Sequence, residues 1–298
     1  MLSKNNEVQA LLQLMDDPDE DVYLSVSERL IDYGKEIIPA LESLVEGHPE
    51  TLVQTRSQAL IRRVYFSDLQ NDFSDWASDK QPDLLKGAVL IARYEYPNLN
   101  QEALMNHFDQ IRRNVWLELN SHLTPMEQVN VINTIFYSFY KFKGHELTER
   151  KAAHFCINYL LDTRQGNGYA LGIFYLSICE LLDLPVFAMD IPRQFVFGYV
   201  HDSLGMLTSM GDYFHRIHFY IDPVNGNIFS QADIDQYLKK INATDRFSYM
   251  LPLLNKRVIY KMLEELALCY KYNSEHQKAE EIAQLMKIIE NKGLDTML

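Results

Sequence analysis

The residue types best suited to bind a metal are a histidine pair, His215 and His218, with His201 and Asp212 nearby in the sequence. Zn²⁺ takes imidazole nitrogens and carboxylate oxygens as ligands, usually three or four from the protein. Residues three apart on a β-strand point to opposite faces, so this pair converges only if the strand begins after His215. His215 and His218 are candidates for a metal site on this pattern, but we expect no metal and no cofactor.

Three cysteines, Cys156, Cys179 and Cys269, are the possible thiol nucleophiles. Each lies in apolar sequence with helical spacing, which is typical of buried core thiols. Their odd number and wide spacing favour a reducing compartment. A thiol with a low pKa and a high native reactivity would indicate cysteine-dependent catalysis instead.

A stretch with two glycines, RQGNG at residues 164–168, precedes a strongly apolar helix predicted from Tyr169. No Lys-Ser or Lys-Thr pair follows the glycines, which excludes phosphate-loop chemistry. Glycines at this point allow close approach to the helix N-terminus, where backbone N–H groups can bind a small anion. The stretch is therefore a candidate binding element.

Three further polar side chains, Arg193, Gln194 and Asp222, lie at the ends of predicted strands. Arg193 and Gln194 could bind a ligand carboxylate or amide, although solvated polar residues are the common case at such positions. Asp222 precedes Pro223, and its alternative role is to cap a turn.

The elements that must hold these residues are mostly helices. Gly numbers 12 and Pro 10, below average usage, so we expect few turns and long helices. Apolar residues recur at helical spacing in 7–66 and in 84–182. The period then changes, and short runs rich in aromatic and β-branched residues at 186–191, 193–200 and 216–223 predict antiparallel strands. The sequence therefore predicts a mainly helical α+β fold with a small antiparallel sheet.

The same patterns give three local expectations. The polar, acidic stretch 71–83 is interpreted as a boundary between domains, and 163–167 as a turn. Arg56, in a helix predicted over residues 52–64, is expected to face solvent.

The charge balance limits the partners. The chain carries 28 Lys and Arg against 41 Asp and Glu, a net charge of −13. This charge repels nucleic-acid phosphates and anionic membranes. The first residues lack a signal-peptide pattern, and the most apolar run, 169–179, is too short to span a bilayer. We expect a cytoplasmic protein whose partner is a protein or peptide.

Both ends of the chain resemble helical repeat families. The segment LLQLMDDPDEDVYLSVSERLIDYGKEIIPALESL resembles a HEAT-type repeat, in which an Asp-Pro-Asp turn joins paired helices. Residues 255–294 resemble one tetratricopeptide hairpin, with facing residues Leu266, Ala267, Tyr270, Ala279 and Ile282. Single repeats cannot bury their apolar faces alone, so both segments are expected to pack on a central domain.

The central region contains five features in a fixed order: Arg164-x-Gly166, the long apolar helix, Leu184-Pro185, Ile191-Pro192-x-x-Phe195 and Ile221-Asp222-Pro223. Together they resemble the transglutaminase-like family that includes the SirB proteins of bacteria. The resemblance covers roughly residues 84 to 290. It implies a papain-like core followed by a tetratricopeptide-like tail.

The resemblance also implies a catalytic arrangement that this chain has lost. Active members of the wider superfamily use a Cys at a helix N-terminus, a His on the next strand and an Asp on the strand after it. By the resemblance, these positions are Gly168, Gln194 and Asp222. Glycine supplies no nucleophile, and glutamine accepts no proton near neutral pH. What remains is a vestigial pocket, whose candidate binding residues are Arg164, Gly166, Asn167, Gly168, Arg193, Gln194 and Asp222.

We therefore expect a HEAT-like segment at 1–70, a transglutaminase-like core at 84–250 and a tetratricopeptide-like hairpin at 255–298. The preferred function is a non-catalytic scaffold that binds a protein or peptide. The alternative is a cysteine- or metal-dependent hydrolase or acyl transferase with a relocated nucleophile. A reactive cysteine or a bound metal would favour this alternative.

Overall fold

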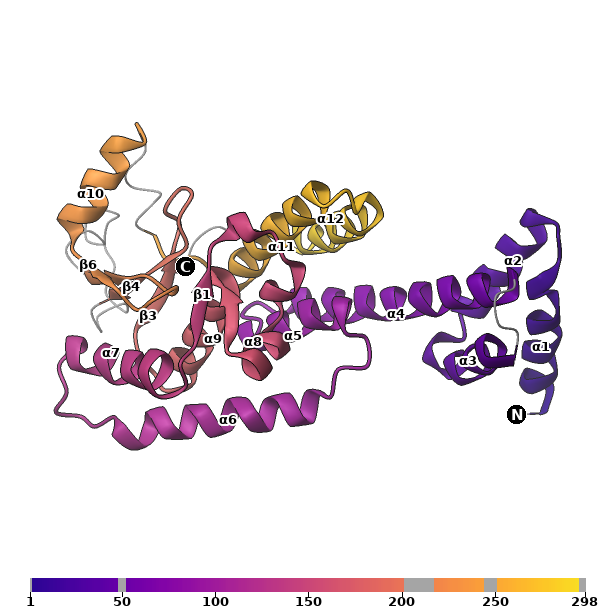
Figure 1. Ribbon diagram of the computed structural model, residues 1–298, viewed down its shortest axis with the longest axis horizontal. Helices are drawn as coiled ribbons and strands as arrows, with labels where there is room; N and C mark the ends of the chain where they lie inside the picture. Colours follow the sequence, from indigo (N-terminus) through magenta and orange to yellow (C-terminus); the bar gives the residue numbers. More distant parts are fainter. Residues whose placement is uncertain (1, 48–51, 201–216, 244–250, 295–298) are drawn as a thin grey trace. The chain divides into compact units, whose positions relative to one another are not determined.

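A computed structural model describes residues 2–47, 52–200, 217–243 and 251–294 (Figure 1). The chain divides into two compact units, Met1–Asp72 and Phe73–Leu298. Helices predominate and strands are few, which confirms the predicted mainly helical α+β class. No helix in the described ranges is both long enough and apolar enough to cross a membrane.

The first unit is entirely helical where it is described. It contains α1 (Leu2–Gln13), α2 (Glu20–Ile31), α3 (Ile38–Gly47) and most of α4 (Leu52–Ser78). Short 3₁₀ turns at Leu14–Asp16 and Gly34–Ile37 follow α1 and precede α3. Apolar residues at helical spacing form its core, which includes Met15, Leu30, Leu41, Leu60 and Val64.

The acidic turn before α2 is stabilised by its own side chains and by an arginine. Asp19 caps α2 by accepting a hydrogen bond from the Asp21 N–H at 2.9 Å. Arg56 on α4 is buried and donates to the carbonyl oxygens of Met15 and Asp17 at 3.0 and 2.6 Å. The expectation that Arg56 faces solvent is wrong, because carbonyls left unpaired at this turn need donors and its guanidinium provides them.

The polar stretch 71–83, interpreted as a boundary, is helical up to Ser78. Phe73 and Trp76 are only 0% and 3% exposed, and Trp76 Nε1 donates to the Asp83 carbonyl at 2.8 Å. These aromatic residues, three apart, give α4 a buried face despite its polar neighbours. The division between the two units falls within α4.

Helix α9 (Gly168–Leu181) lies at the centre of the second unit (Figure 1). Its residues 169–179 are all buried. It contacts α5 (Leu84–Glu95), α8 (Ile157–Thr163) and β3 (Val186–Met189). A helix that is apolar over most of its length therefore packs between other helices and a sheet, as its sequence requires.

The main sheet is antiparallel, with strand order β3, β4 (Val196–Val200), β5 (Ile217–Ile221) and β6 (Ile228–Phe229). Met189 pairs with Val196, and Phe197 pairs with Ile221. Helix α10 (Gln231–Lys240) contacts β5 and β6. These positions confirm the small antiparallel sheet predicted from the aromatic and β-branched runs.

A second, two-stranded sheet lies beside the start of α9. Strands β1 (Lys143–His145) and β2 (Gln165–Asn167) pair in parallel, with Gly144 opposite Gly166 and His145 opposite Asn167. The expectation of a turn over 163–167 is wrong except at Arg164, because Thr163 ends α8 and residues 165–167 form β2. A three-residue strand is too short to show the alternation that identifies strands in a sequence.

Four more helices complete the second unit. Helices α6 (Gln101–Glu118) and α7 (Pro125–Asn133) precede the short π-helical segment η3 (Thr134–Phe139). Helices α11 (Asn255–Tyr272) and α12 (His276–Asn291) form a hairpin, and α11 contacts α5. The residues expected to face each other in the hairpin are all buried: Leu266, Ala267, Tyr270, Ala279 and Ile282.

Candidate functional site

Asn167 and Gly168 form the N-terminus of α9, at the end of β2. Asn167 is the N-cap, and its Oδ1 accepts hydrogen bonds from the N–H groups of Tyr169 and Ala170, both at 3.0 Å. Its Nδ2 is buried and has no hydrogen-bond partner among the described residues. Gly168 is the first residue of α9, which is where the resemblance places the nucleophile. A buried, unpaired amide N–H next to a helix N-terminus is suited to an acceptor group on a ligand.

The loop that follows β5 packs on this helix N-terminus. A Cβ built on Gly168 would lie 3.3 Å from Val224 Cγ2. A Cβ on Gly144 of β1 would lie 2.5 Å from Val224 Cγ1 and 2.7 Å from the Val224 carbonyl oxygen. The structure therefore brings Gly168 and the Asp222 loop together, and Val224 fills part of the space that a side chain at position 168 would need.

Asp222 shapes this loop. Its Oδ1 accepts a hydrogen bond from the Val224 N–H at 2.8 Å, and its carbonyl accepts from the Gly226 N–H at 2.8 Å. Partial burial raises the pKa of the Asp222 carboxyl, against the opposing effect of hydrogen bonds from Val224 and Asn225. The turn-capping role foreseen as an alternative for Asp222 is therefore present in the structure.

Two side chains from α7 and η3 bind the same loop. Tyr137 Oη donates to the Pro223 carbonyl at 2.8 Å, and Asn133 Nδ2 donates to the Gly226 carbonyl at 2.8 Å. Gly226 has a φ of 74°, and a Cβ there would lie 2.6 Å from the Tyr137 ring. Asn133 and Tyr137 could not be predicted as part of the site, because no local pattern links them to a loop about 90 residues away. The only indication in the sequence is that these two residues are four apart, which places them on the same face of a helix.

Arg193 and Gln194 are exposed in the turn before β4. Arg193 has a φ of 61°, and the Gln194 N–H donates to the Ile191 carbonyl at 3.3 Å. Phe195, the next residue, stacks on Tyr169 in the first turn of α9 with ring centroids 4.5 Å apart. No hydrogen bond joins Gln194 to Asp222 within the described part of the chain.

Arg164 and Gly166 make packing contacts with neighbouring elements. The Arg164 guanidinium lies over the rings of Tyr140 and Phe142, at 5.1 and 5.4 Å from their centroids, and 3.5 Å from His107 Nε2. Burial and the nearby Arg164 charge lower the pKa of His107. A Cβ on Gly166 would lie 3.1 Å from Leu160, so glycine allows β2 to approach α8.

Of the candidate binding residues, Asn167, Gly168 and Asp222 form one site with Val224.

The predicted metal candidates are only partly described. His201, Asp212 and His215 lie outside the described residues. His218 lies on β5, exposed, with its ring edge-on to Tyr199 at 6.0 Å between centroids.

All three cysteines are buried free thiols. Burial raises the pKa of Cys156, Cys179 and Cys269. Cys156 is the N-cap of α8, a position that can lower a thiol pKa. Here full burial and the nearby Glu95 charge have the opposite effect, so the protonated form of the Cys156 thiol is favoured.

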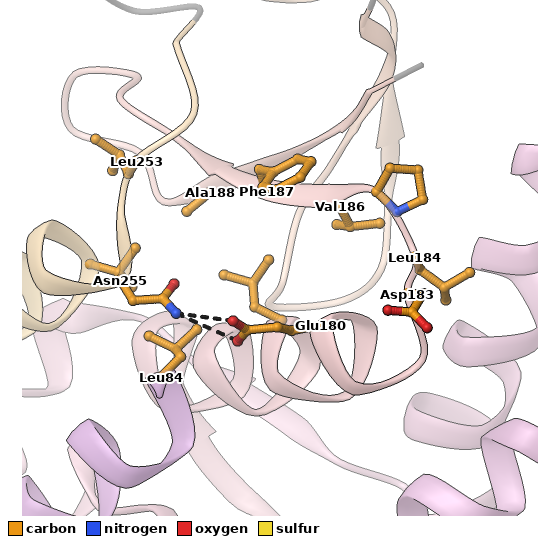
Figure 2. Close-up of a pocket in the computed structure, with 12 residues that line it drawn as sticks. Leu84, Glu180, Asp183, Leu184, Val186, Phe187, Ala188, Leu253 and Asn255 are labelled. Atoms are coloured by element: carbon orange, nitrogen blue, oxygen red, sulfur yellow. Dashed lines mark hydrogen bonds between the residues drawn. The ribbon is translucent and has the colours of Figure 1, made fainter. Parts of the chain in front are cut away.

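A cavity of about 300 Å³ lies at the other end of α9 (Figure 2). Its apolar walls come from α9, β3, the start of α5 and the chain around the start of α11, and Glu180 and Asn255 lie next to each other in its lining. Asn255 Nδ2 donates to the two Glu180 carboxylate oxygens at 3.2 and 3.5 Å. Loss of water beside these walls raises the pKa of Glu180, and the Asn255 hydrogen bond opposes the rise. No sequence pattern indicates this cavity, because its walls come from segments far apart in the chain.

Comparison with known proteins agrees with this architecture. Residues 102–264, more than half of the chain, match the family model of the transglutaminase-like superfamily. The chain is 27% identical over 172 residues to UPF0162 protein YchA of Escherichia coli K12, covering 56% of this chain and 57% of YchA. It is 26% identical over 121 residues to UPF0162 protein BU173 of Buchnera aphidicola subsp. Acyrthosiphon pisum, covering 41% and 40%. The matched regions thus span about half or less of these relatives, and no solved structure matches. The chain belongs to the transglutaminase-like superfamily.

Proposed function

We propose that this chain is a transglutaminase-like binding module of the SirB type, which holds a peptide segment of a partner protein without cysteine chemistry. The main support is Gly168 at the first position of α9, with Val224 3.3 Å from the place of a Cβ. The inherited nucleophile position has no reactive atom and is partly covered. Three buried thiols with raised pKa values count against a relocated cysteine nucleophile.

The Glu180 cavity is the binding place we propose for the peptide. Leu84, Leu176, Val186 and Val258 give it apolar walls, and the Glu180 carboxylate supplies the charge. A long side chain with an apolar stem and a basic end, Lys or Arg, matches this combination. The net charge of −13 also favours a basic partner.

The helical ends support a binding role as well. The α11–α12 hairpin buries the residues expected of a tetratricopeptide-like hairpin, and the α1–α2 turn has the Asp-Pro-Asp sequence of a HEAT-like repeat. Such repeats generally present surfaces to other proteins. We propose both identities for these segments, with three segments at 1–70, 84–250 and 255–298.

Fluorescence anisotropy with short labelled peptides tests this function. Peptides with a central Lys or Arg flanked by Leu should bind, and the same peptides with a central Glu should not. Glu180→Lys should weaken binding at least tenfold, because it replaces attraction by repulsion at the cavity. Glu118→Lys, an equal charge change at the exposed end of α6, is the matched control and should leave affinity within about twofold.

Two outcomes would overturn the proposal. Equal affinity of the wild-type protein and Glu180→Lys for the basic peptide would remove the cavity as the binding place. Cleavage or cross-linking of the bound peptide, detected by mass spectrometry, would show catalysis and contradict a purely binding role.

A further inference from the structure

Three side chains with metal-ligand chemistry meet beside β1, although they are spread over ten residues of irregular chain. His145 is the last residue of β1, Glu149 ends the 3₁₀ turn Leu147–Glu149, and His154 lies in the 3₁₀ turn Ala152–Phe155. One potential ligand atom from each residue lies within 4.8 Å of the others. We propose that His145, Glu149 and His154 bind a divalent transition-metal ion, with Zn²⁺ as the best match.

The chain conformation places the Glu149 carboxylate beside the Nδ1 atoms of both imidazoles. His145 Nδ1 lies 2.6 Å from Glu149 Oε1, and His154 Nδ1 lies 4.0 Å from Glu149 Oε2. Arg150, directly after Glu149, has a φ of 50°, which reverses the chain. Its guanidinium lies 4.2 Å from the Tyr272 ring centroid, and its carbonyl accepts from Asn273 Nδ2 at 3.0 Å. The turn that positions Glu149 is therefore attached to the α11–α12 hairpin.

The two imidazoles are arranged as a pair. Their rings stack with centroids 4.5 Å apart and planes 25° apart. His154 is 3% exposed, and the Tyr159 ring lies beside it at 5.6 Å. Stacking and burial therefore hold the two rings side by side.

A fourth residue orients the ligand on β1. Gln165 Oε1, on the paired strand β2, lies 3.2 Å from His145 Nε2. Metal-bound histidines commonly donate their second N–H to an oxygen, which fixes the ring and leaves the other nitrogen for the metal. His145 would then bind through Nδ1, the atom that already faces Glu149.

The donor set fits Zn²⁺ with one coordination position left for water. Two imidazoles and one carboxylate form a known zinc ligand set, and the same set suits Co²⁺ and Fe²⁺. Zinc bonds of about 2.1 Å separate tetrahedral donors by about 3.4 Å. The two separations from the histidine Nδ1 atoms to the Glu149 oxygens, 2.6 and 4.0 Å, lie on either side of this value. The Lys151 ammonium, 3.9 Å from Glu149 Oε2, is 65% exposed and can move away into solvent.

The test uses the full chain without an affinity tag, stripped of metal with a chelator. Zn²⁺ binding is measured by competition with a colorimetric chelator, and Co²⁺ binding by the visible absorption of a tetrahedral complex. The wild-type protein should bind one ion at this site. His145→Asn and Glu149→Gln should each weaken binding by more than tenfold. Gln165→Ala should weaken it by about tenfold, as expected for a residue that orients a metal ligand through a hydrogen bond.

His122→Asn, at an exposed histidine before α7, is the matched control and should bind like the wild type. His145 and Glu149 are solvent-accessible, so these variants avoid the folding risk of changing buried His154, and circular dichroism verifies their fold. The proposal fails if the wild-type protein binds no Zn²⁺, or if His145→Asn and Glu149→Gln bind as tightly as the wild type. It also fails if His215→Asn, and not His145→Asn, abolishes binding.

This site is distinct from the proposed peptide site. It lies beside the first residues of α9, whereas Glu180 is twelve residues along that helix, or about 18 Å at 1.5 Å per residue. Loss of Zn²⁺ binding in His145→Asn with unchanged peptide binding would separate the two functions.

Discussion

Single residues explain why the Asp222 loop can lie on the start of α9. Gly144 and Gly168 have no side chains, and Val224 occupies the space above both. Three hydrogen bonds of 2.8 Å then hold the loop in place. Asp222 accepts two of them, from the N–H groups of Val224 and Gly226, and Tyr137 donates the third to the Pro223 carbonyl. The contact between the Asp222 loop and α9 thus depends on the missing side chains of Gly144 and Gly168.

Gly144→Ala should destabilise the protein by about 1–3 kcal/mol, because its Cβ would overlap Val224 side-chain and backbone atoms at 2.5 to 2.8 Å. Gly47→Ala is the control, since no atom lies within 4 Å of a Cβ there. It should be neutral or slightly stabilising. Urea unfolding measures both, and equal stabilities for the two variants would contradict the packing described for Val224.

The Asp222 carboxyl gives a pH-dependent prediction. Its pKa is raised in the folded state, mainly by burial. The folded protein therefore binds this proton more tightly than the unfolded chain does. The resulting stability is fully present below the ordinary aspartate pKa of about 3.9 and is lost as the pH rises through the folded-state pKa.

Asp222→Asn does not titrate but keeps the oxygen that accepts the Val224 N–H bond. Its free energy of unfolding relative to the wild type should therefore increase from pH 4 to pH 7. Chemical denaturation at both pH values measures the difference. A constant difference, or one that falls with pH, would show that the pKa of Asp222 is not raised.

The position of a single residue can be predicted from the sequence where the pattern of one helix or strand is enough to place it. Gly168 is at the start of α9 because the apolar run and the preceding Asn define that helix end. Val224 and Asn133 could not be predicted, because their contacts join segments far apart in the chain. The sequence does contain H-x₃-E-x₄-H at residues 145–154, but no regular period indicates that the three side chains converge.

At the scale of elements, α9 organises the second unit, and its N-cap is the critical position. Asn167 supplies two hydrogen bonds to otherwise unpaired N–H groups. Asn167→Ala should lower the free energy of unfolding by about 1 kcal/mol, within the range of 0.5–2 kcal/mol for lost caps. Asn167→Ser keeps a capping oxygen and should therefore retain most of the stability that Asn167→Ala loses. Similar losses for Ala and Ser would show that the cap contributes little.

Elements with a long, consistent period were predictable, and short or mixed ones were not. The strands at 186–200 and 217–221 and helix α9 follow directly from their aromatic and apolar runs. Strands β1 and β2 have three residues each, which is too few for a period. Arg56 shows a different limit, since an arginine on a helix is buried when carbonyl acceptors surround it.

At the scale of the whole molecule, the chain has separate apolar cores. The cluster around Leu30, Leu41 and Leu60 contains only residues up to position 65. Leu41→Ala should therefore destabilise the first unit by about 2–5 kcal/mol, since Leu41 is fully buried. Hydrogen exchange should accelerate in α2 and α3 and remain unchanged in α9. Equal acceleration in α9 would show that the two units unfold together.

The most direct test of the central claim, a transglutaminase-like fold without a cysteine nucleophile, is the alkylation rate of each cysteine in the native protein at neutral pH. Peptide mass spectrometry maps the modified residues and compares them with the denatured chain. We predict that Cys156, Cys179 and Cys269 all stay unmodified until the protein unfolds, because each is buried with a raised pKa. One cysteine that reacts faster in the native protein than in the denatured chain would contradict the account and identify a relocated nucleophile.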